Sequence, residues 1–359
     1  MGFNCGIIGL PNVGKSTLFN ALTESIIADA QNYPFCTIEP NTGKVVVPDD
    51  LFFKLADTAK SKKIVPTQLE FVDIAGLVKG ASKGEGLGNK FLSHISNVDA
   101  IIHVVRCFED DDITHVNGII NPLQDIDIIE TELILSDLES LEKQIKNIEK
   151  KAKGQNKESK DLLEKAFFVK ENLEKGIPSR FLKLEKDYFN LLTNKPVIYV
   201  CNVEEKSIIY GNKYSDLVIN KYKNISSVLI ISAKIEMEIS QIIDKKEKKM
   251  FLSEFGLIES GLDKIIKGGY EILNLQTFYT IGPKESHAWS ITKGFTAPQA
   301  AGKIHSDFEK GFIRAEIISP EDFLYYGSEL QVKEAGKLKL VGKDYIIQNG
   351  DICHFLFNL

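Results

Sequence analysis

The chain has 359 residues, enough for two or three domains, and its 43% hydrophobic and 26% charged residues are typical of a globular protein. Forty-four basic residues against fifty acidic ones give a net charge of −6, so the whole chain is not a general nucleic-acid binder and any RNA contact requires a local basic patch. No apolar run is long enough to span a bilayer, and we expect no membrane partner.

The first predicted element is a buried strand, because residues 3–10 read FNCGIIGL, a short apolar and β-branched run. No basic segment or cleavage site precedes it. The five cysteines are scattered and form no C-x-x-C pair. We therefore expect reduced thiols in a cytoplasmic protein.

A phosphate-binding loop follows this strand. Residues 9–16, GLPNVGKS, match G-x-x-x-x-G-K-[ST], with a helix-like pattern after them. Glycines at this spacing let backbone N–H groups converge on phosphate oxygens, and the helix N-terminus adds the positive end of its dipole. Lys15 places its charge on the β- and γ-phosphates, and the Ser16 hydroxyl is a ligand for Mg²⁺. We expect nucleotide contacts from Asn12, Val13, Gly14, Lys15, Ser16 and Thr17.

The next motif is typical of switch NTPases. The predicted strand LEFVDIAGL ends in D-x-x-G at Asp73 and Gly76. Asp73 is expected to hold Mg²⁺ through water, and the Gly76 N–H to reach the γ-phosphate during catalysis. Between the two motifs lies Thr37, which is expected to complete the metal shell only while the γ-phosphate is present. The sequence thus predicts a magnesium site formed by Ser16, Thr37 and Asp73.

The residue after D-x-x-G bears on how the attacking water is oriented. Leu77 directly follows D-x-x-G, where Ras-like enzymes have a glutamine, so intrinsic hydrolysis should be slow. Two devices could replace the glutamine: His94, carried behind the Gly-rich residues 79–89, and a K⁺ ion bound with the help of Asn12. The alternatives are a surface or helix-packing role for His94 and a turn role for Asn12.

Three further buried strands are predicted at 99–107, 195–202 and 226–234. Strands that alternate with helices and carry site residues at their carboxyl ends indicate a doubly wound α/β sheet. The last of these strands leads into Ser232 and Ala233, which occupy the position of the loop behind the base. We expect both residues to contact the nucleotide.

The loop after residue 201 argues against guanine. It reads N-V-E-E, where a guanine-specific enzyme carries N-K-x-D. Val203 replaces the lysine that packs on the base, and Glu205 replaces the aspartate with one extra methylene, so the base-reading carboxylate is out of register. Asn202 is expected to tie this loop to the phosphate loop, and the Val203 backbone to line the base. The alternative is a GTPase that still accepts GTP although its N-K-x-D motif has changed.

Residues 108–194 exceed what a plain switch domain needs between two strands, and we interpret them as a helical coiled-coil insertion. A heptad seam is formed by Ile134, Leu138, Leu141, Ile145 and Ile148. A second helical pattern runs through Leu162, Ala166, Leu173 and Leu184. We expect two antiparallel helices whose charges form either a solvated face or a partner surface.

The last part of the chain, residues 276–359, contains short strands with turns between them: QTFYTIG, AWSITKG, FIRAEII and DICHFLF. A candidate RNA-facing patch consists of Lys293, Lys303, His305, Lys310 and Arg314, near Trp289 and Phe295. A structural role for Trp289 is the alternative.

Several long motifs together resemble the YchF or Obg-like ATPase family over almost the whole chain: GLPNVGKST, NYPFCTIEPN, DIAGLVKGASKGEGLGNKFLSHI, FEDDDITHV and APQAAGKIHSDFEKGFIRAE. The resemblance implies a P-loop NTPase domain (1–107 and 195–275), a coiled-coil insertion (108–194) and a C-terminal β-grasp (TGS) domain (276–359). It also implies preference for ATP over GTP and association with the large ribosomal subunit. Contacts with rRNA or tRNA would involve the TGS domain and the coiled coil. We expect a monomer that uses Mg²⁺, with K⁺ as a second candidate cofactor.

Three rival functions remain open. The chain could be a GTPase switch of the same fold, a phosphotransferase for a small molecule, or a ribosome- or RNA-binding module that works without nucleotide. A phosphotransferase needs an acceptor pocket and a lid, and neither the insertion nor the C-terminal domain resembles a lid.

Overall fold

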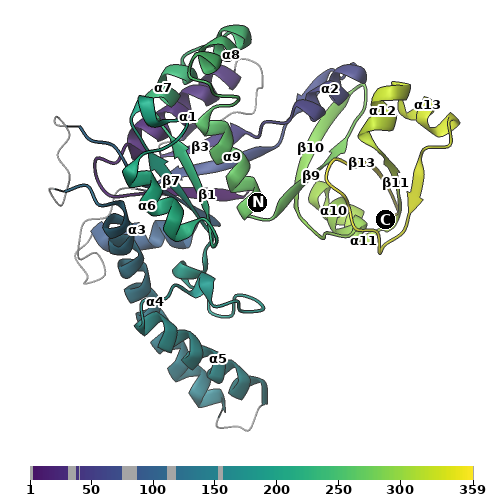
Figure 1. Ribbon diagram of the computed structural model, residues 1–359. Helices are drawn as coiled ribbons and strands as arrows, with labels where there is room; N and C mark the ends of the chain where they lie inside the picture. Colours follow the sequence, from purple (N-terminus) through teal and green to yellow (C-terminus); the bar gives the residue numbers. More distant parts are fainter. Residues whose placement is uncertain are drawn as a thin grey trace.

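The computed structural model describes residues 3–30, 38, 39, 41–74, 87–110, 119–152 and 157–358. Figure 1 shows three parts: an α/β unit, two long helices that project from it, and a second sheet unit that contains the C-terminus. Within the described residues, the strands form one sheet of seven and one of six. The first sheet carries the candidate site.

The seven described strands of the first sheet have the order β2-β3-β5-β1-β6-β7-β8. They are β1 (Asn4–Ile8), β2 (Ile38–Glu39), β3 (Thr42–Val46), β5 (Gln68–Asp73), β6 (Ala100–Arg106), β7 (Val197–Asn202) and β8 (Ser227–Ile231). Neighbours from β5 to β8 are parallel, and β2 and β3 add an antiparallel edge. Strands β6 and β7 are buried throughout, as continuous apolar runs predict for strands covered on both faces. The predicted doubly wound α/β sheet is confirmed.

Helices lie on both sides of this sheet in Figure 1. They include α1 (Lys15–Ala30), α3 (Leu87–Ser96), α6 (Lys213–Tyr222), α7 (Ala233–Ser240), α8 (Lys245–Glu254) and α9 (Gly261–Ile272). Helix α9 lies close against the sheet, because a Cβ on Gly269 would be 2.9 Å from Leu69 Cδ2. Its first turn is held by the buried Glu236 carboxylate, which accepts hydrogen bonds from the N–H groups of Gly261 (2.7 Å) and Leu262 (3.0 Å). The helix is thus fixed at its start and along its length.

The projecting part consists of α4 (Pro122–Ala152) and α5 (Lys157–Glu174), which run antiparallel in Figure 1. The first turns of α4 pack in the core of the α/β unit through Ile126, Ile129 and Leu133, and the rest of the helix leaves that unit. The seam residues predicted from the sequence share one apolar cluster with α5: Ile134, Leu138, Leu141, Ile145, Ile148, Leu162, Ala166 and Leu173. We call this projecting pair of helices, α4 and α5, the arm. Its first helix, α4, begins in the core of the α/β unit and continues outward into the arm.

Leu184 lies outside the second helix, contrary to the expectation from the sequence. Helix α5 ends at Glu174, and Gly176 follows with a φ of +77°, the left-handed conformation in which many helices end. Leu184 still packs against the apolar cluster of α4 and α5, from the segment that returns to the sheet.

Among the helices that the structure describes, none is long and apolar enough to cross a membrane.

Asp137 of α4 fixes the segment that returns to the sheet. Its carboxylate is 2% exposed and accepts the N–H groups of Leu192 (2.7 Å) and Thr193 (2.8 Å) and the Thr193 hydroxyl (2.6 Å). Burial raises the pKa of this carboxyl, although the hydrogen bonds oppose the shift. Short 3-10 helices cover Ser179–Phe181, Leu192–Asn194 and Glu205–Ser207.

The six described strands of the second sheet have the order β12-β11-β13-β9-β10-β4. They are β4 (Lys63–Val65), β9 (Leu275–Thr280), β10 (Glu285–Thr292), β11 (Phe312–Ile318), β12 (Lys339–Val341) and β13 (Ile352–Phe357). Figure 1 shows α10 (Ala297–Ile304) and α11 (Ser306–Lys310) on one side of this sheet. On the other side lie α2 (Asp50–Thr58), α12 (Pro320–Tyr326) and α13 (Glu329–Glu334). Each side has its own apolar cluster.

Residues 50–65 belong to this second unit, whereas the sequence analysis placed all of residues 1–107 in the nucleotide-binding domain. Strand β4 runs parallel to β10, with Lys63 opposite Glu285, and the two side chains form an ion pair of 2.6 Å. Helix α2 buries Phe52 among side chains of the second unit. The paired residues are 222 positions apart, and no local sequence pattern encodes such a pairing.

Candidate functional site

The turn between β1 and α1 has the backbone geometry of a phosphate loop. Asn12 (φ +62°) and Gly14 (φ +93°) adopt the left-handed conformation, which glycine reaches without strain. A Cβ on Gly14 would be 2.2 Å from Asn202 Nδ2, and a Cβ on Gly9 would be 2.6 Å from the Val104 carbonyl oxygen. Steric contacts therefore require glycine at both positions of the motif in this structure.

Asn202, at the end of β7, joins the phosphate loop to the loop after β8. Its Nδ2 donates to the Val13 carbonyl oxygen (2.9 Å), and its Oδ1 accepts from the Ala233 N–H (2.9 Å). The Asn202 side chain is buried. The connection predicted from the sequence is present, and it sets the distance between the phosphate end and the base end of the site.

Replacing Asn202 with alanine is expected to lower the free energy of unfolding by about 2 kcal/mol, because the Val13 carbonyl and the Ala233 N–H lose their partner. Nucleotide affinity should fall with it. Chemical denaturation and nucleotide titration measure both effects. Asn172→Ala is the control, since its side chain makes only one exposed hydrogen bond, to Phe168 on the arm. Equal losses in the two variants would contradict the bridging role.

Lys15 and Asp73 meet at the centre of the site. Lys15 Nζ lies 2.6 Å from Asp73 Oδ1, and the two side chains are only 11% and 17% exposed. Lys15 begins α1 and Asp73 ends β5, so the ion pair joins the first residue of the helix to the carboxyl end of the neighbouring strand. The pair thus holds the Lys15 ammonium and the Asp73 carboxylate together beside the phosphate loop.

The oxygen donors present fit a Mg²⁺ ion. Mg²⁺ takes hydroxyl, carboxylate, water and phosphate oxygens. Ser16 offers a hydroxyl in the first turn of α1, and Asp73 offers a carboxylate beside Lys15. Thr37 and Gly76, the other predicted contacts, lie outside the described residues and stay predictions.

A cavity of about 1350 Å³ opens over the phosphate loop. It is bounded by the phosphate loop and by the segments that follow β6, β7 and β8, so it lies at the carboxyl edge of the parallel sheet. The predicted residues that line it are Asn12, Gly14, Lys15, Ser16, Thr17, Asn202, Val203, Glu205, Ser232 and Ala233. Val13 contributes its carbonyl to the Asn202 bridge instead.

At the base end of the cavity, the two glutamates of N-V-E-E have different partners. Glu204 turns inward and accepts from Asn212 Nδ2 (2.9 Å) and the Ser207 hydroxyl (2.8 Å). Glu205 lies at the rim, 2.5 Å from Lys234 Nζ, and this contact raises the pKa of the lysine. The Glu205 carboxylate is therefore drawn to a lysine of the loop after β8.

His94 does not line this cavity. It is exposed and lies in the last turn of α3, after which the chain enters β6 at the amino end of that strand. The phosphate loop lies at the opposite, carboxyl edge of the sheet. The structure therefore does not bring His94 together with the other predicted residues.

One wall of the cavity was not predicted from the sequence. It is formed by Phe108, Glu109, Lys213 and Tyr214. The Tyr214 hydroxyl donates to Glu109 Oε1 (2.7 Å), and Lys213 Nζ lies 2.8 Å from the same oxygen. Phe108 and Glu109 begin the motif FEDDDITHV, which could have indicated them, whereas no motif marks Tyr214.

Two family models match the chain. Residues 4–165 match a model described as a 50S ribosome-binding GTPase. Residues 275–358 match the C-terminal model of YchF GTPases, described as a protein of unknown function (DUF933).

Curated relatives match over full length. The chain is 54% identical to "Ribosome-binding ATPase YchF" of Haemophilus influenzae over 367 residues, 52% to that of Escherichia coli O157:H7 and 50% to that of Bacillus subtilis, each match covering 100% of both chains. Among solved structures, the Schizosaccharomyces pombe YchF GTPase matches with a TM-score of 0.87 and 39% identity, covering 99% of this chain and 98% of that one. A GTP-binding protein of Pyrococcus horikoshii, at 20% identity and a TM-score of 0.61, shares the fold.

Proposed function

The chain belongs to the YchF family, and we propose that it binds ATP with Mg²⁺, hydrolyses it slowly to ADP and phosphate, and associates with the large ribosomal subunit. The observation that supports the nucleotide part most directly is the Asn202 bridge across a cavity built on the phosphate loop. The chemistry expected there is positioning and charge neutralisation, since phosphoryl transfer needs little covalent help from the protein.

The residues divide this work. The phosphate-loop N–H groups and Lys15 bind and orient the β- and γ-phosphates. Ser16 and Asp73 would hold Mg²⁺, with Thr37 joining them in the ATP state, and the bound ion would neutralise charge on the phosphates. Asp73 also keeps Lys15 in place through the 2.6 Å ion pair. The Gly76 N–H would contact the γ-phosphate.

Removing Mg²⁺ is expected to lower ATP turnover by about a hundredfold or more, because charge neutralisation by the metal contributes several kcal/mol. Phosphate release with excess chelator, followed by restoration with added Mg²⁺, measures the effect. Asp73→Asn should need more Mg²⁺ for half-maximal turnover. Undiminished turnover in chelator would contradict a metal-dependent site.

The base-reading loop lacks the residues for guanine recognition, since Val203 and Glu205 stand where it needs lysine and aspartate, and the names of the curated relatives support ATP as the nucleotide. The names of the matched proteins include both activities, so a GTPase of the same fold is the competing function. Competition titration calorimetry with ATP and GTP at one Mg²⁺ concentration separates the two. Tighter binding of GTP would support the competing function.

We assign the assisting role in hydrolysis to K⁺ near Asn12 rather than to His94. Asn12 lines the cavity over the phosphate loop, whereas His94 is exposed on α3 outside it. Turnover should be severalfold faster in K⁺ than in Na⁺ at equal ionic strength. Asn12→Gly, which keeps the left-handed turn, should remove this difference, and His94→Ala should retain it. The reverse pattern would restore His94 as the catalytic group.

Ribosome association is supported by exposed basic side chains on the second unit: Lys293, Lys303, His305, Lys310 and Arg314. Trp289 has a structural role, because its Nε1 donates to Thr280 (3.0 Å) and its ring stacks on His287 at 3.6 Å.

Contacts with rRNA or tRNA would use these basic side chains and the arm. We propose that the protein is monomeric and cytoplasmic. Cosedimentation with large subunits, with and without ATP, tests the association. No cosedimentation in either condition would overturn it.

A further inference from the structure

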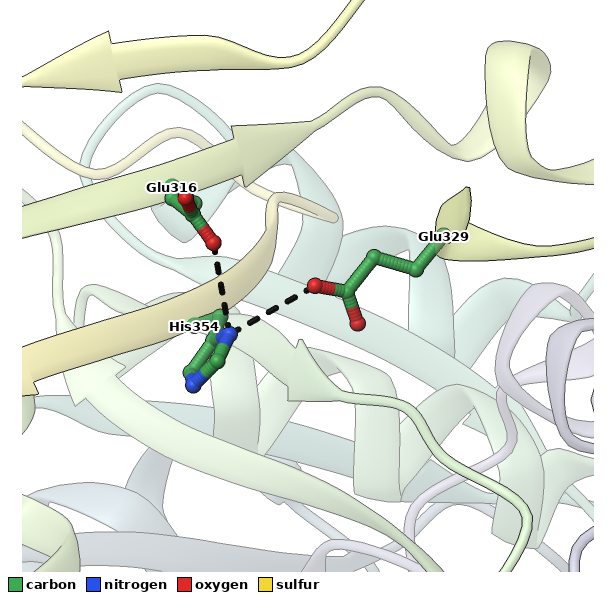
Figure 2. Close-up of side chains that lie close together, drawn as sticks. All are labelled: Glu316, Glu329 and His354. Carbon is green, nitrogen blue, oxygen red and sulfur yellow. Dashed lines mark ion pairs between the residues drawn. The ribbon is translucent and has the colours of Figure 1, made fainter. Parts of the chain in front are cut away.

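A histidine and two glutamates of the second unit converge far from the phosphate loop. Glu316 of β11 and His354 of β13 are directly opposite in the antiparallel register, and Glu329 is the first residue of α13. Figure 2 shows the two carboxylates approaching the same ring nitrogen, His354 Nδ1, at 3.4 Å for Glu316 and 3.5 Å for Glu329. One ligand atom from each residue lies within 4.8 Å of the others.

These distances fit a shared cation better than direct pairing. A charge-assisted hydrogen bond from imidazolium to carboxylate is about 2.7–2.9 Å long, and both contacts exceed it. Tetrahedral ligands placed about 2.0–2.1 Å from Zn²⁺ are about 3.3 Å apart. The two observed separations are close to this value.

The surroundings also leave room for an ion. The same three residues line a cavity of about 20 Å³, enough for one water molecule or metal ion. Glu316 is held in the sheet with its side chain 14% exposed, while Glu329 and His354 are 47% and 58% exposed. Glu329 therefore has more freedom to adjust by side-chain rotation than Glu316 has.

We infer that Glu316, Glu329 and His354 form a binding site for a divalent zinc ion. Imidazole nitrogen with carboxylate oxygens is a donor set that suits Zn²⁺, whereas Ca²⁺ and Mg²⁺ take oxygen ligands almost exclusively. Three protein ligands leave the fourth position for water or an incoming group. The ion would connect β11, β13 and α13, so it should stabilise the second unit.

The test uses the full chain, freed of metal by chelation and titrated with Zn²⁺ alone by calorimetry, without nucleotide. One Zn²⁺ should bind, and His354→Gln and Glu316→Gln should each weaken binding by about tenfold or more. His305→Gln is the matched control, because His305 has one carboxylate partner, Asp307 at 3.3 Å. The affinity of this variant for Zn²⁺ should stay within about twofold of the wild-type value. Thermal melting in chelator checks that each variant folds.

An anomalous difference map of wild-type crystals soaked in Zn²⁺ gives a second readout that needs no variant. A peak between His354 Nδ1 and the two carboxylates is expected. Absence of that peak, unchanged affinity in folded His354→Gln, or Ca²⁺ binding as tight as Zn²⁺ would each overturn the assignment.

Discussion

Replacing Lys15 with alanine is expected to lower ATP turnover by about a hundredfold or more. Lys15 places the only positive charge that the phosphate-loop motif itself supplies over the β- and γ-phosphates, and one fixed electrostatic contact to a transition state contributes about 2.7–4 kcal/mol. The variant also leaves the 83%-buried Asp73 side chain without the cation that lies 2.6 Å away. Phosphate release at saturating ATP and Mg²⁺ measures the loss.

A second lysine of the same cavity provides the control for Lys15→Ala. Lys234 lines the base end, is 73% exposed and pairs with Glu205 at the rim. Lys234→Ala changes the net charge equally but should lower turnover by less than about threefold, since exposed pairs contribute little. Turnover close to wild type in Lys15→Ala would refute the phosphate-loop assignment, and equal losses in both variants would indicate a general charge effect.

The phosphate end of the site could be predicted from the sequence because its motif consists of consecutive residues. Gly9, Gly14, Lys15 and Ser16 lie within eight residues of one another, although the contacts that require glycine at positions 9 and 14 come from the distant Val104 and Asn202. Strands β6 and β7 could also be predicted from the sequence, because their continuous apolar runs are typical of a buried parallel strand. Asn202 could be placed because it ends such a strand.

The features that the sequence analysis missed depend on contacts between distant segments. Tyr214 enters the site through a hydrogen bond to Glu109, 105 positions away. Strand β4 joins the second sheet by pairing with β10, although three residues carry little signal of their own. His94 shows the opposite case, since a suitable residue type near a Gly-rich segment was predicted to be catalytic and lies outside the cavity.

Changing Val203 to lysine together with Glu205 to aspartate is expected to raise the ratio of GTP to ATP affinity by about ten- to a hundredfold. The double change restores N-K-x-D, and each polar match to guanine contributes roughly 1–3 kcal/mol. The shorter aspartate should also no longer reach Lys234, which now holds the Glu205 carboxylate at 2.5 Å. The carboxylate is then available for the N1–H and N2–H₂ groups of guanine.

Val203 is the more demanding of the two positions, because its side chain is 2% exposed and packs in the main core. A lysine there must direct its stem along the cavity wall to reach solvent, so denaturation of the double variant has to be measured beside its affinities. Glu205→Asp alone leaves the core intact and should give part of the shift. If both folded variants keep the wild-type ratio, the base is read elsewhere in the cavity, with the missed wall of Phe108 and Tyr214 as the next place to look. If the wild type already prefers GTP, the proposal of an ATPase fails while the phosphate-loop site remains.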